Sequence, residues 1–223
     1  MRVFNHNIRL TAATLLALCL SSYLYSASAH ADDLRDISKV NGGIRVDAND
    51  TVGNVSSVNG GIDIRRGASA YDVETVNGGI DIEDDVEITR AETVNGGIRL
   101  GRSVKVNGSL ESVNGGISSE GGSVIERGIS TVNGKIRLKD KFVGEDIETS
   151  NGDIELRNGT VIEGDVIVKR NHNWFNRFFS FNRHRNSIVI DSSSAVHGDI
   201  HLYREVDLRI ADGAEVGKVI EHF

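Results

Sequence analysis

The chain contains no proline among its 223 residues, although average usage of about 5% would give about 11. Proline lacks the N–H group that a strand ladder needs, so within sheets it is confined to edges, first positions and bulges. Its absence fits a fold in which nearly every strand lies between two others.

Cysteine is almost absent as well, and the one cysteine, Cys19, lies in an N-terminal segment with the features of a signal peptide. Arg2 and Arg9 form a basic region, an apolar run covers 10–20, and a small-x-small cleavage site ends at Ala31. A membrane anchor is the weaker alternative, because the run is shorter than about 20 residues. We therefore expect residues 1–31 to be cleaved and the protein to be exported to the periplasm or cell surface.

Cleavage after Ala31 would leave residues 32–223 without a thiol, which excludes disulfides, thiolate metal sites and a cysteine nucleophile there. Without Arg2 and Arg9, 23 basic residues remain against 32 acidic ones, a net charge of −9. Such an acidic surface is typical of a soluble protein and argues against nucleic acid as a partner.

What the chain does contain is a repeat, Val-Asn-Gly-Gly-Ile, in five complete copies and two degenerate ones that start at Val132 and Ser150. Its asparagines follow one another at steps of 18, 18, 18, 19, 19 and 18 residues. A short period held over seven copies is typical of one supersecondary unit stacked on itself. The asparagines, which we expect at structural corners, are Asn41, Asn59, Asn77, Asn95, Asn114, Asn133 and Asn151.

The residues after each motif alternate between apolar and polar, as in Ile62, Asp63 and Ile64, which is the pattern of a half-buried strand. Two further apolar patches in each period indicate about three short strands per repeat. Three strands in 18 or 19 residues form one turn of a parallel β-solenoid. Antiparallel hairpins closed by Asn-Gly turns are the alternative. Hairpins, however, would not require the motif to recur at a constant interval along the chain.

The sequence therefore predicts an all-β, single-stranded parallel β-solenoid over residues 32–223, with about nine or ten turns. We expect right-handed turns, as in parallel crossovers generally, because the hexapeptide rhythm of a left-handed β-helix is not found. We expect the apolar motif residues to point inward: Val40, Ile44, Val58, Ile62, Val76, Ile80, Val94, Ile98, Val113, Ile117, Val132, Ile136, Ile154 and Leu156.

Asparagine and glycine suit the corners because both accept positive φ more readily than other residues. We accordingly expect Gly78 and Gly79 to have positive φ, so that valine at either position would destabilise the fold. Stacked asparagines can also form an amide ladder. Asn107 and Asn158 fall outside the phase and are expected at other corners.

A different segment interrupts the C-terminal third, at about 170–186. The stretch 169–185 has five Lys and Arg residues and no acidic one, and it holds five aromatic residues in a chain that is 5% aromatic. We expect this segment to form a loop that projects from one turn of the solenoid. Loops carry function more often than scaffolds do. The candidate partner contacts are Trp174, Phe175, Arg177, Phe178, Phe179, Phe181, Arg183 and Arg185.

Three roles for this loop stay open. Its aromatic residues could fold back over one face of the solenoid. They could instead contact an envelope protein or a glycan, since aromatic residues and arginine dominate binding hot spots. A basic, aromatic and amphipathic segment could also dock on an anionic membrane surface.

No catalytic constellation stands out, and the sequence predicts no cofactor and no metal site. His172 and His184 share the loop, but their spacing matches no known ligand pattern. The acidic run that includes Asp81 and 83–85 could hold calcium, although a solvated charge run is the simpler interpretation. Paired carboxylates for polysaccharide cleavage stay open, since acidic residues are plentiful and none is singled out.

The signal peptide, the phased Val-Asn-Gly-Gly-Ile turns and the ending at 203–219 resemble the adhesin family of exported bacterial β-strand-repeat proteins. The turns at 164–166 and 198–200 are similar, more weakly, to bactofilins, whose β-helices form filaments. The first resemblance implies a non-enzymatic envelope β-solenoid that serves as an adhesin or a binding or structural scaffold. The alternatives are a self-assembling polymer that grows end to end and, less favoured, a polysaccharide-active enzyme.

Overall fold

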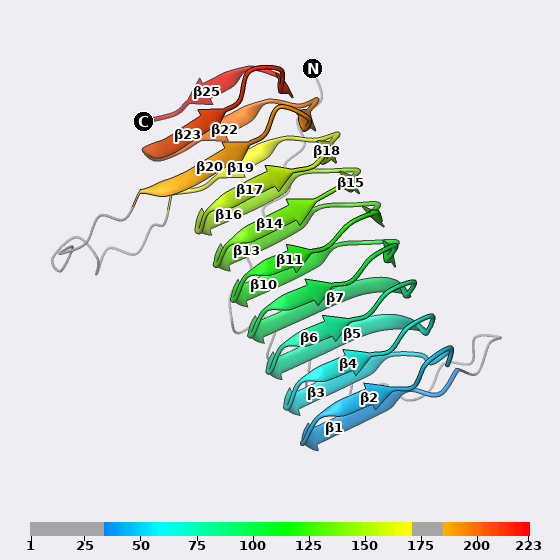
Figure 1. The fold of residues 1–223 in the computed structure, drawn as a ribbon. Helices are drawn as coiled ribbons and strands as arrows, with labels where there is room; N and C mark the ends of the chain where they lie inside the picture. The colour runs from blue at the N-terminus through cyan, green and yellow to red at the C-terminus, as the bar shows by residue number, and fades with distance from the viewer. Residues whose placement is uncertain (1–33, 171–184) are drawn as a thin grey trace, which may run out of the picture.

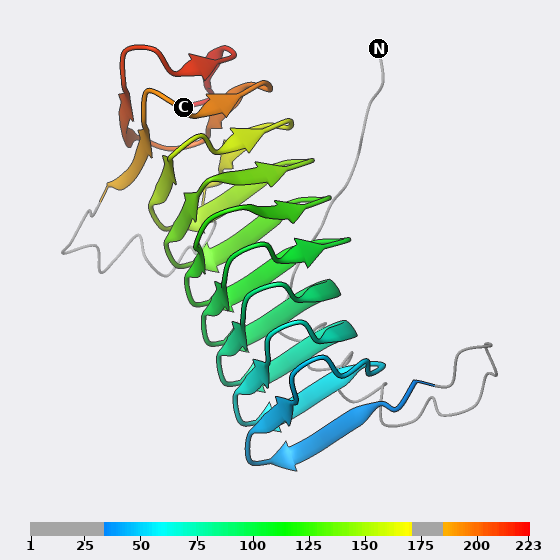
Figure 2. The same ribbon diagram turned by 45° about the vertical axis from the view of Figure 1, so that its right-hand side comes forward.

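The computed structural model describes residues 34–170 and 185–223, and all regular structure in these ranges is β-strand. The strands are parallel and stack in about nine turns of a β-solenoid (Figure 1). Figure 2 shows the turns succeeding one another along one axis, with the first and last turns at opposite ends. The prediction of an all-β parallel solenoid is confirmed, and antiparallel hairpins are not formed by the described strands.

The strands of successive turns lie on three faces of the solenoid. Face 1 contains β1 (Ile37–Asn41), β3 (Val55–Asn59), the second halves of β5 (Ser69–Asn77) and β7 (Glu87–Asn95), β10 (Leu110–Asn114), β13 (Ile129–Asn133), β16 (Ile147–Asn151), β19 (Val166–Val168), β22 (Ile200–Leu202) and β25 (Val219–Glu221). Face 2 contains β2 (Ile44–Val46), β4 (Ile62–Ile64), β6 (Ile80–Ile82), β8 (Ile98–Leu100), β11 (Ile117–Ser119), β14 (Ile136–Lys139), β17 (Ile154–Arg157), β20 (Asn186–Ile190) and β23 (Val206–Ile210).

Face 3 is built from shorter strands. It contains the first halves of β5 and β7, then β9 (Lys105–Val106), β12 (Ser123–Ile125), β15 (Lys141–Val143), β18 (Val161–Ile162), β21 (Ala195–Val196) and β24 (Glu215–Val216). Because β5 and β7 run through the corner between faces 3 and 1, these two faces join into one 16-stranded sheet, beside a 9-stranded sheet on face 2.

The core is a stack of in-register apolar columns inside the turns. The motif isoleucines Ile44, Ile62, Ile80, Ile98, Ile117, Ile136 and Ile154, with Leu156, are buried as predicted. Pairing places like residues on like, as in Ile62 on Ile80 and Ile80 on Ile98. Each turn therefore buries its apolar side chains against the turns above and below.

The motif valines do not belong to this core, so their predicted inward orientation is wrong. In β5 the inward residues are Val73 and Thr75, and alternation turns Val76 outward. The inward orientation was predicted by counting alternate residues from Ile80 back to Val76. This count fails because the chain turns a corner between these two residues. Val76 and Val94 form a separate outer cluster with Val58 and Val113, whereas Val40 in the first turn is 46% exposed.

The first glycine of each motif is required by close stacking rather than by positive φ. A Cβ atom on Gly78 would overlap the carbonyl group of Gly60 in the preceding turn, and the same overlap recurs from Gly60 to Gly152. Among the described motif copies, positive φ occurs only at Gly42. The expected positive φ of Gly78 and Gly79 is therefore wrong, although Gly78 still cannot carry a side chain.

The second glycine is less constrained. A Cβ atom on Gly79 would lie 3.3 Å from the carbonyl oxygen of Gly97, a contact that a small shift relieves. The two degenerate copies of the motif are consistent with this difference. Lys135 and Asp153 occupy the second glycine position, whereas the first position is still glycine, at Gly134 and Gly152. Positive φ occurs instead at other corners, including Asn158 at 56°, which confirms a corner there.

Two ladders of hydrogen bonds hold the motif corner. Outside, each motif asparagine donates its side-chain amide to the asparagine of the preceding turn, over 2.8–3.2 Å from Asn59 to Asn151. Arg204 closes this ladder by donating to the Oδ1 atom of Asn151 over 2.8 Å. Inside, hydroxyl groups such as that of Thr75 donate to the carbonyl oxygen of the first glycine, here Gly60, over 2.9 Å. The predicted amide ladder is confirmed.

The glycine contacts predict unequal effects of two neighbouring substitutions. Gly78→Ala should lower the free energy of unfolding by about 2 kcal/mol or more, since a buried overlap forces the turns apart. Gly79→Ala should cost less than about 1 kcal/mol. Urea unfolding followed by circular dichroism measures both, and equal losses would contradict this account of the corner.

The amide ladder predicts a dependence on position. Asn95→Ala removes two ladder bonds and should cost about 1–3 kcal/mol, whereas Asn41→Ala removes one bond at the end and should cost about half as much. Neither residue has positive φ, so alanine adds no backbone strain. Thermal unfolding of both variants provides the comparison, and a harmless Asn95→Ala would show that the ladder contributes nothing to stability.

Candidate functional site

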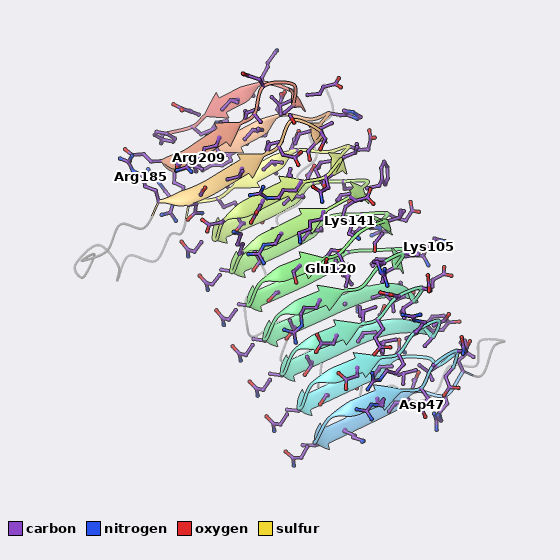
Figure 3. The ribbon with its side chains drawn as sticks, viewed as in Figure 1. Asp47, Lys105, Glu120, Lys141, Arg185 and Arg209 are labelled. Atoms are coloured by element: carbon purple, nitrogen blue, oxygen red, sulfur yellow. The ribbon has the colours of Figure 1, made fainter. Side chains whose placement is uncertain are left out.

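A shallow groove of about 450 Å³ lies on the outer side of face 2, over β6, β8 and β11 and the corner that follows them. Glu120 stands at this corner (Figure 3). The lining residues are Arg66, Asp81, Ile82, Glu83, Asp84, Arg99, Leu100, Gly101, Ser118 and Glu120. Seven of these ten residues are polar or charged, and the charges are of both signs.

Three of the four carboxylates of the groove, those of Asp81, Glu83 and Asp84, are held by arginines from adjacent turns. Asp81 accepts two hydrogen bonds from Arg99, at 2.5 and 3.0 Å. Asp84 accepts from Arg102 at 2.8 Å and from Arg66 at 3.1 Å. Hydrogen bonds from the backbone and side chain of Arg102 lower the pKa of Asp84 below its ordinary value.

Glu83 is ionised for a similar reason, because a hydrogen bond from Arg65 lowers its pKa. A general acid in glycoside hydrolysis needs a raised pKa, so that it is protonated near neutral pH. Glu83 and Asp84 are therefore unsuited to that role. Within 34–170 and 185–223, no group of three or more His, Cys, Asp or Glu residues is arranged to hold a metal ion.

A second charged cluster lies on the outer side of face 1, around Arg90. Its guanidinium contacts Asp72 at 3.0 Å and both Glu74 and Glu92 at 2.9 Å. Strand register stacks Glu74, Glu92 and Glu111 in one column. Glu92 is only 7% exposed, and burial outweighs the attraction of Arg90 and raises the pKa of Glu92 to about 7.

Sequence reasoning did not single out Glu92, although a signal was present. Glu74, Glu92 and Glu111 follow one another at 18 and 19 residues, the steps of the motif. Residues separated by one period share a column in a solenoid, so like charges at this spacing indicate a stacked acidic column.

The described histidines do not form one site. His197 contacts Glu163 at 3.1 Å, whereas the Nδ1 atom of His201 lies 3.1 Å from the Nε2 atom of His222. Tyr203 stacks on His222 with ring centroids 4.2 Å apart. His172 and His184 lie outside the described residues.

Most candidate partner contacts also lie outside the described residues, namely Trp174, Phe175, Arg177, Phe178, Phe179, Phe181 and Arg183, as does the expected signal peptide. Arg185 (Figure 3) is described, and it forms a 2.9 Å ion pair with Glu205. Asn186, expected at the end of the loop, is the buried first residue of β20. Its side-chain amide donates to the carbonyl oxygen of Ser150 over 3.1 Å, so it belongs to the solenoid.

The part of the chain that the structure describes has no helix long and apolar enough to cross a membrane. Comparison of the chain with models of protein families, with curated proteins and with solved structures gives no match.

The burial of Glu92 predicts a pH-dependent stability. Because the folded protein binds the proton more tightly, the free energy of unfolding should fall as the pH rises from about 4.5 to about 7. The fall due to Glu92 is at most about 3 kcal/mol. Glu92→Gln should remove it and raise stability at pH 7 and above, as measured by urea unfolding across this range.

Glu111→Gln is the matched control, since it removes one charge from the next turn and leaves Glu92 in place. This variant should keep most of the fall. An unchanged pH profile in Glu92→Gln would contradict the assignment.

Proposed function

We propose that this chain is an exported, non-enzymatic envelope protein: a rigid β-solenoid that presents one basic, aromatic loop to an anionic envelope component. The observation that carries the proposal is the continuous pairing of the strands on both sides of residues 171–184. β19 pairs with β16 and β22, and β20 pairs with β17 and β23, so the strands on both sides of 171–184 keep their register. The described strand pairs form a continuous stack on both sides of this segment, and segments between scaffold strands carry function more often than the scaffold does.

Charge favours an anionic partner. Residues 169–185 hold five Lys and Arg residues and no acidic one, in a chain that is otherwise acidic. The loop is therefore the segment best suited to an acidic glycan or anionic lipid headgroups. The resemblance to exported β-strand-repeat adhesins supports the same role.

The groove favours binding over catalysis. Asp81, Glu83 and Asp84 form ion pairs with arginines, and the pKa values of Glu83 and Asp84 are lowered rather than raised. Paired charges of both signs suit the recognition of polar groups. They do not supply the proton that glycosidic bond cleavage needs.

The test replaces 171–184 by a Gly-Ser linker and keeps both Arg185 and Asn186. The variant should retain its β-sheet circular dichroism spectrum, because the linker lies outside every described strand pair. Co-sedimentation with vesicles rich in anionic lipid, and with insoluble peptidoglycan, should fall about tenfold or more relative to the parent protein.

Zwitterionic vesicles serve as the control and should bind neither protein. Loss of folding would show that the loop covers the solenoid. Unchanged binding would reject the loop as the contact, and release of reducing sugars from envelope polysaccharide would reject the non-enzymatic assignment.

A further inference from the structure

Three ring side chains lie together on the outer side of face 1, where β22 and β25 pair in adjacent turns (Figure 1). They belong to His201, Tyr203 and His222. Alternation along β22 turns His201 outward. Strand register pairs Leu202 with Glu221, so His222 follows opposite Tyr203. The backbone N–H of His222 donates to the carbonyl oxygen of Leu202 over 2.8 Å, so the backbone holds both histidines in place.

The two imidazoles face each other through one ring nitrogen each. The Nδ1 atom of His201 lies 3.1 Å from the Nε2 atom of His222, with ring centroids 5.3 Å apart and 20° between the ring planes. Tyr203 stacks on His222 at 4.2 Å and 8°, which fixes the plane of that ring. The pair therefore has a defined geometry.

That geometry is the one that a shared metal ion requires. Neutral imidazole binds metal ions through the lone pair of either ring nitrogen. Two imidazole nitrogens that each lie about 2.0–2.1 Å from one ion are about 2.9–3.4 Å apart, for angles at the ion between square and tetrahedral. The separation between the two histidine nitrogens falls within this range.

His201 is oriented by a carboxylate on its other ring nitrogen. The Oδ2 atom of Asp165 lies 3.5 Å from the Nε2 atom of His201. The Oδ1 atom of Asp165 accepts the backbone N–H of Asp199 over 2.8 Å, which fixes the carboxylate. Its charge favours the proton on Nε2 and leaves the lone pair of Nδ1 directed at His222. Histidines that bind metal ions almost always donate their second nitrogen to such a partner.

We propose that His201 and His222 bind one divalent ion of a late transition metal, through Nδ1 of the first and Nε2 of the second. Imidazole is a ligand for Cu²⁺, Zn²⁺ and Ni²⁺, whereas Mg²⁺ and Ca²⁺ prefer oxygen. The site has two protein ligands, since no group of three or more His, Cys, Asp or Glu residues in the described ranges is arranged to hold an ion. His222 is exposed, so water completes the coordination sphere.

His197 lies in a different environment and serves as the comparison. Its Nδ1 atom faces the carboxylate of Glu163 at 3.1 Å, where His201 faces a second imidazole. The hydrogen bond to Glu163 raises the pKa of His197. This pairing favours the protonated ring, which has no lone pair for a metal ion.

The experiment uses the untagged protein recovered after export, titrated with copper(II) chloride and separately with zinc chloride in a calorimeter. The parent should bind one ion per chain, and magnesium chloride should give no binding. His201→Gln and His222→Gln should each weaken the affinity about tenfold or more, because each leaves a single imidazole. Electron paramagnetic resonance of the Cu²⁺ complex should show two bound nitrogens in the parent and one in either variant.

Asp165→Asn tests the orienting carboxylate. The amide keeps an oxygen for the N–H of Asp199 but turns a donor toward His201, which moves the imidazole proton to Nδ1. The affinity should fall about tenfold. His197→Gln is the matched control and should bind like the parent. The linker variant of 171–184 should also bind like the parent, which separates this site from His172 and His184. Circular dichroism confirms that each variant is folded.

A parent that binds neither Cu²⁺ nor Zn²⁺ saturably would overturn the proposal. So would histidine variants that bind like the parent, and so would loss of binding in His197→Gln or in the linker variant, because the ion would then lie elsewhere. None of these outcomes bears on the anionic partner of the loop, which co-sedimentation with vesicles and peptidoglycan tests separately.

Discussion

The fold depends on how closely successive turns approach at the Asn-Gly-Gly corner. From Gly60 to Gly152, the first glycine of each motif copy lies against the carbonyl group of the glycine one turn earlier, so closely that no side chain fits between them. This contact sets the period, because only a chain that returns to the corner after 18 or 19 residues can place glycine on glycine. The amide ladder, the hydroxyl column and the stacked isoleucines all follow from that register.

Much of this architecture could be predicted from the sequence, because a solenoid repeats its local signals. Asn41 and its six counterparts marked the corners, and Ile80 and its counterparts marked the core. The outward orientation of Val76 could not be predicted from the alternation of apolar and polar residues, because that alternation does not continue through a corner of the chain. Glycine occurs both where the backbone needs positive φ and where two backbones approach closely. The motif alone does not show which of these two requirements its glycines meet. Lys135 and Asp153 did carry that information, because they occupy the less crowded position.

The charged surface was harder to predict. Glu83, Asp84 and Glu92 are all acidic residues at outer positions, yet arginines lower the pKa of the first two and burial raises that of the third. Which carboxylate meets an arginine depends on contacts between adjacent turns, and these follow from the register rather than from neighbours in the sequence. The period places both kinds of charge in columns, so the spacing of acidic residues is informative once a solenoid is established.

The central claim, that in-register stacking at the corner holds the chain together, is tested most directly by adding a turn. A second copy of residues 77–94, inserted after Val94, supplies one complete period with its own Asn-Gly-Gly corner. The account predicts a folded protein whose urea m-value rises by roughly a ninth, because unfolding then exposes one further buried turn. An unchanged m-value would mean that the added residues stay outside the stack, and it would contradict the claim.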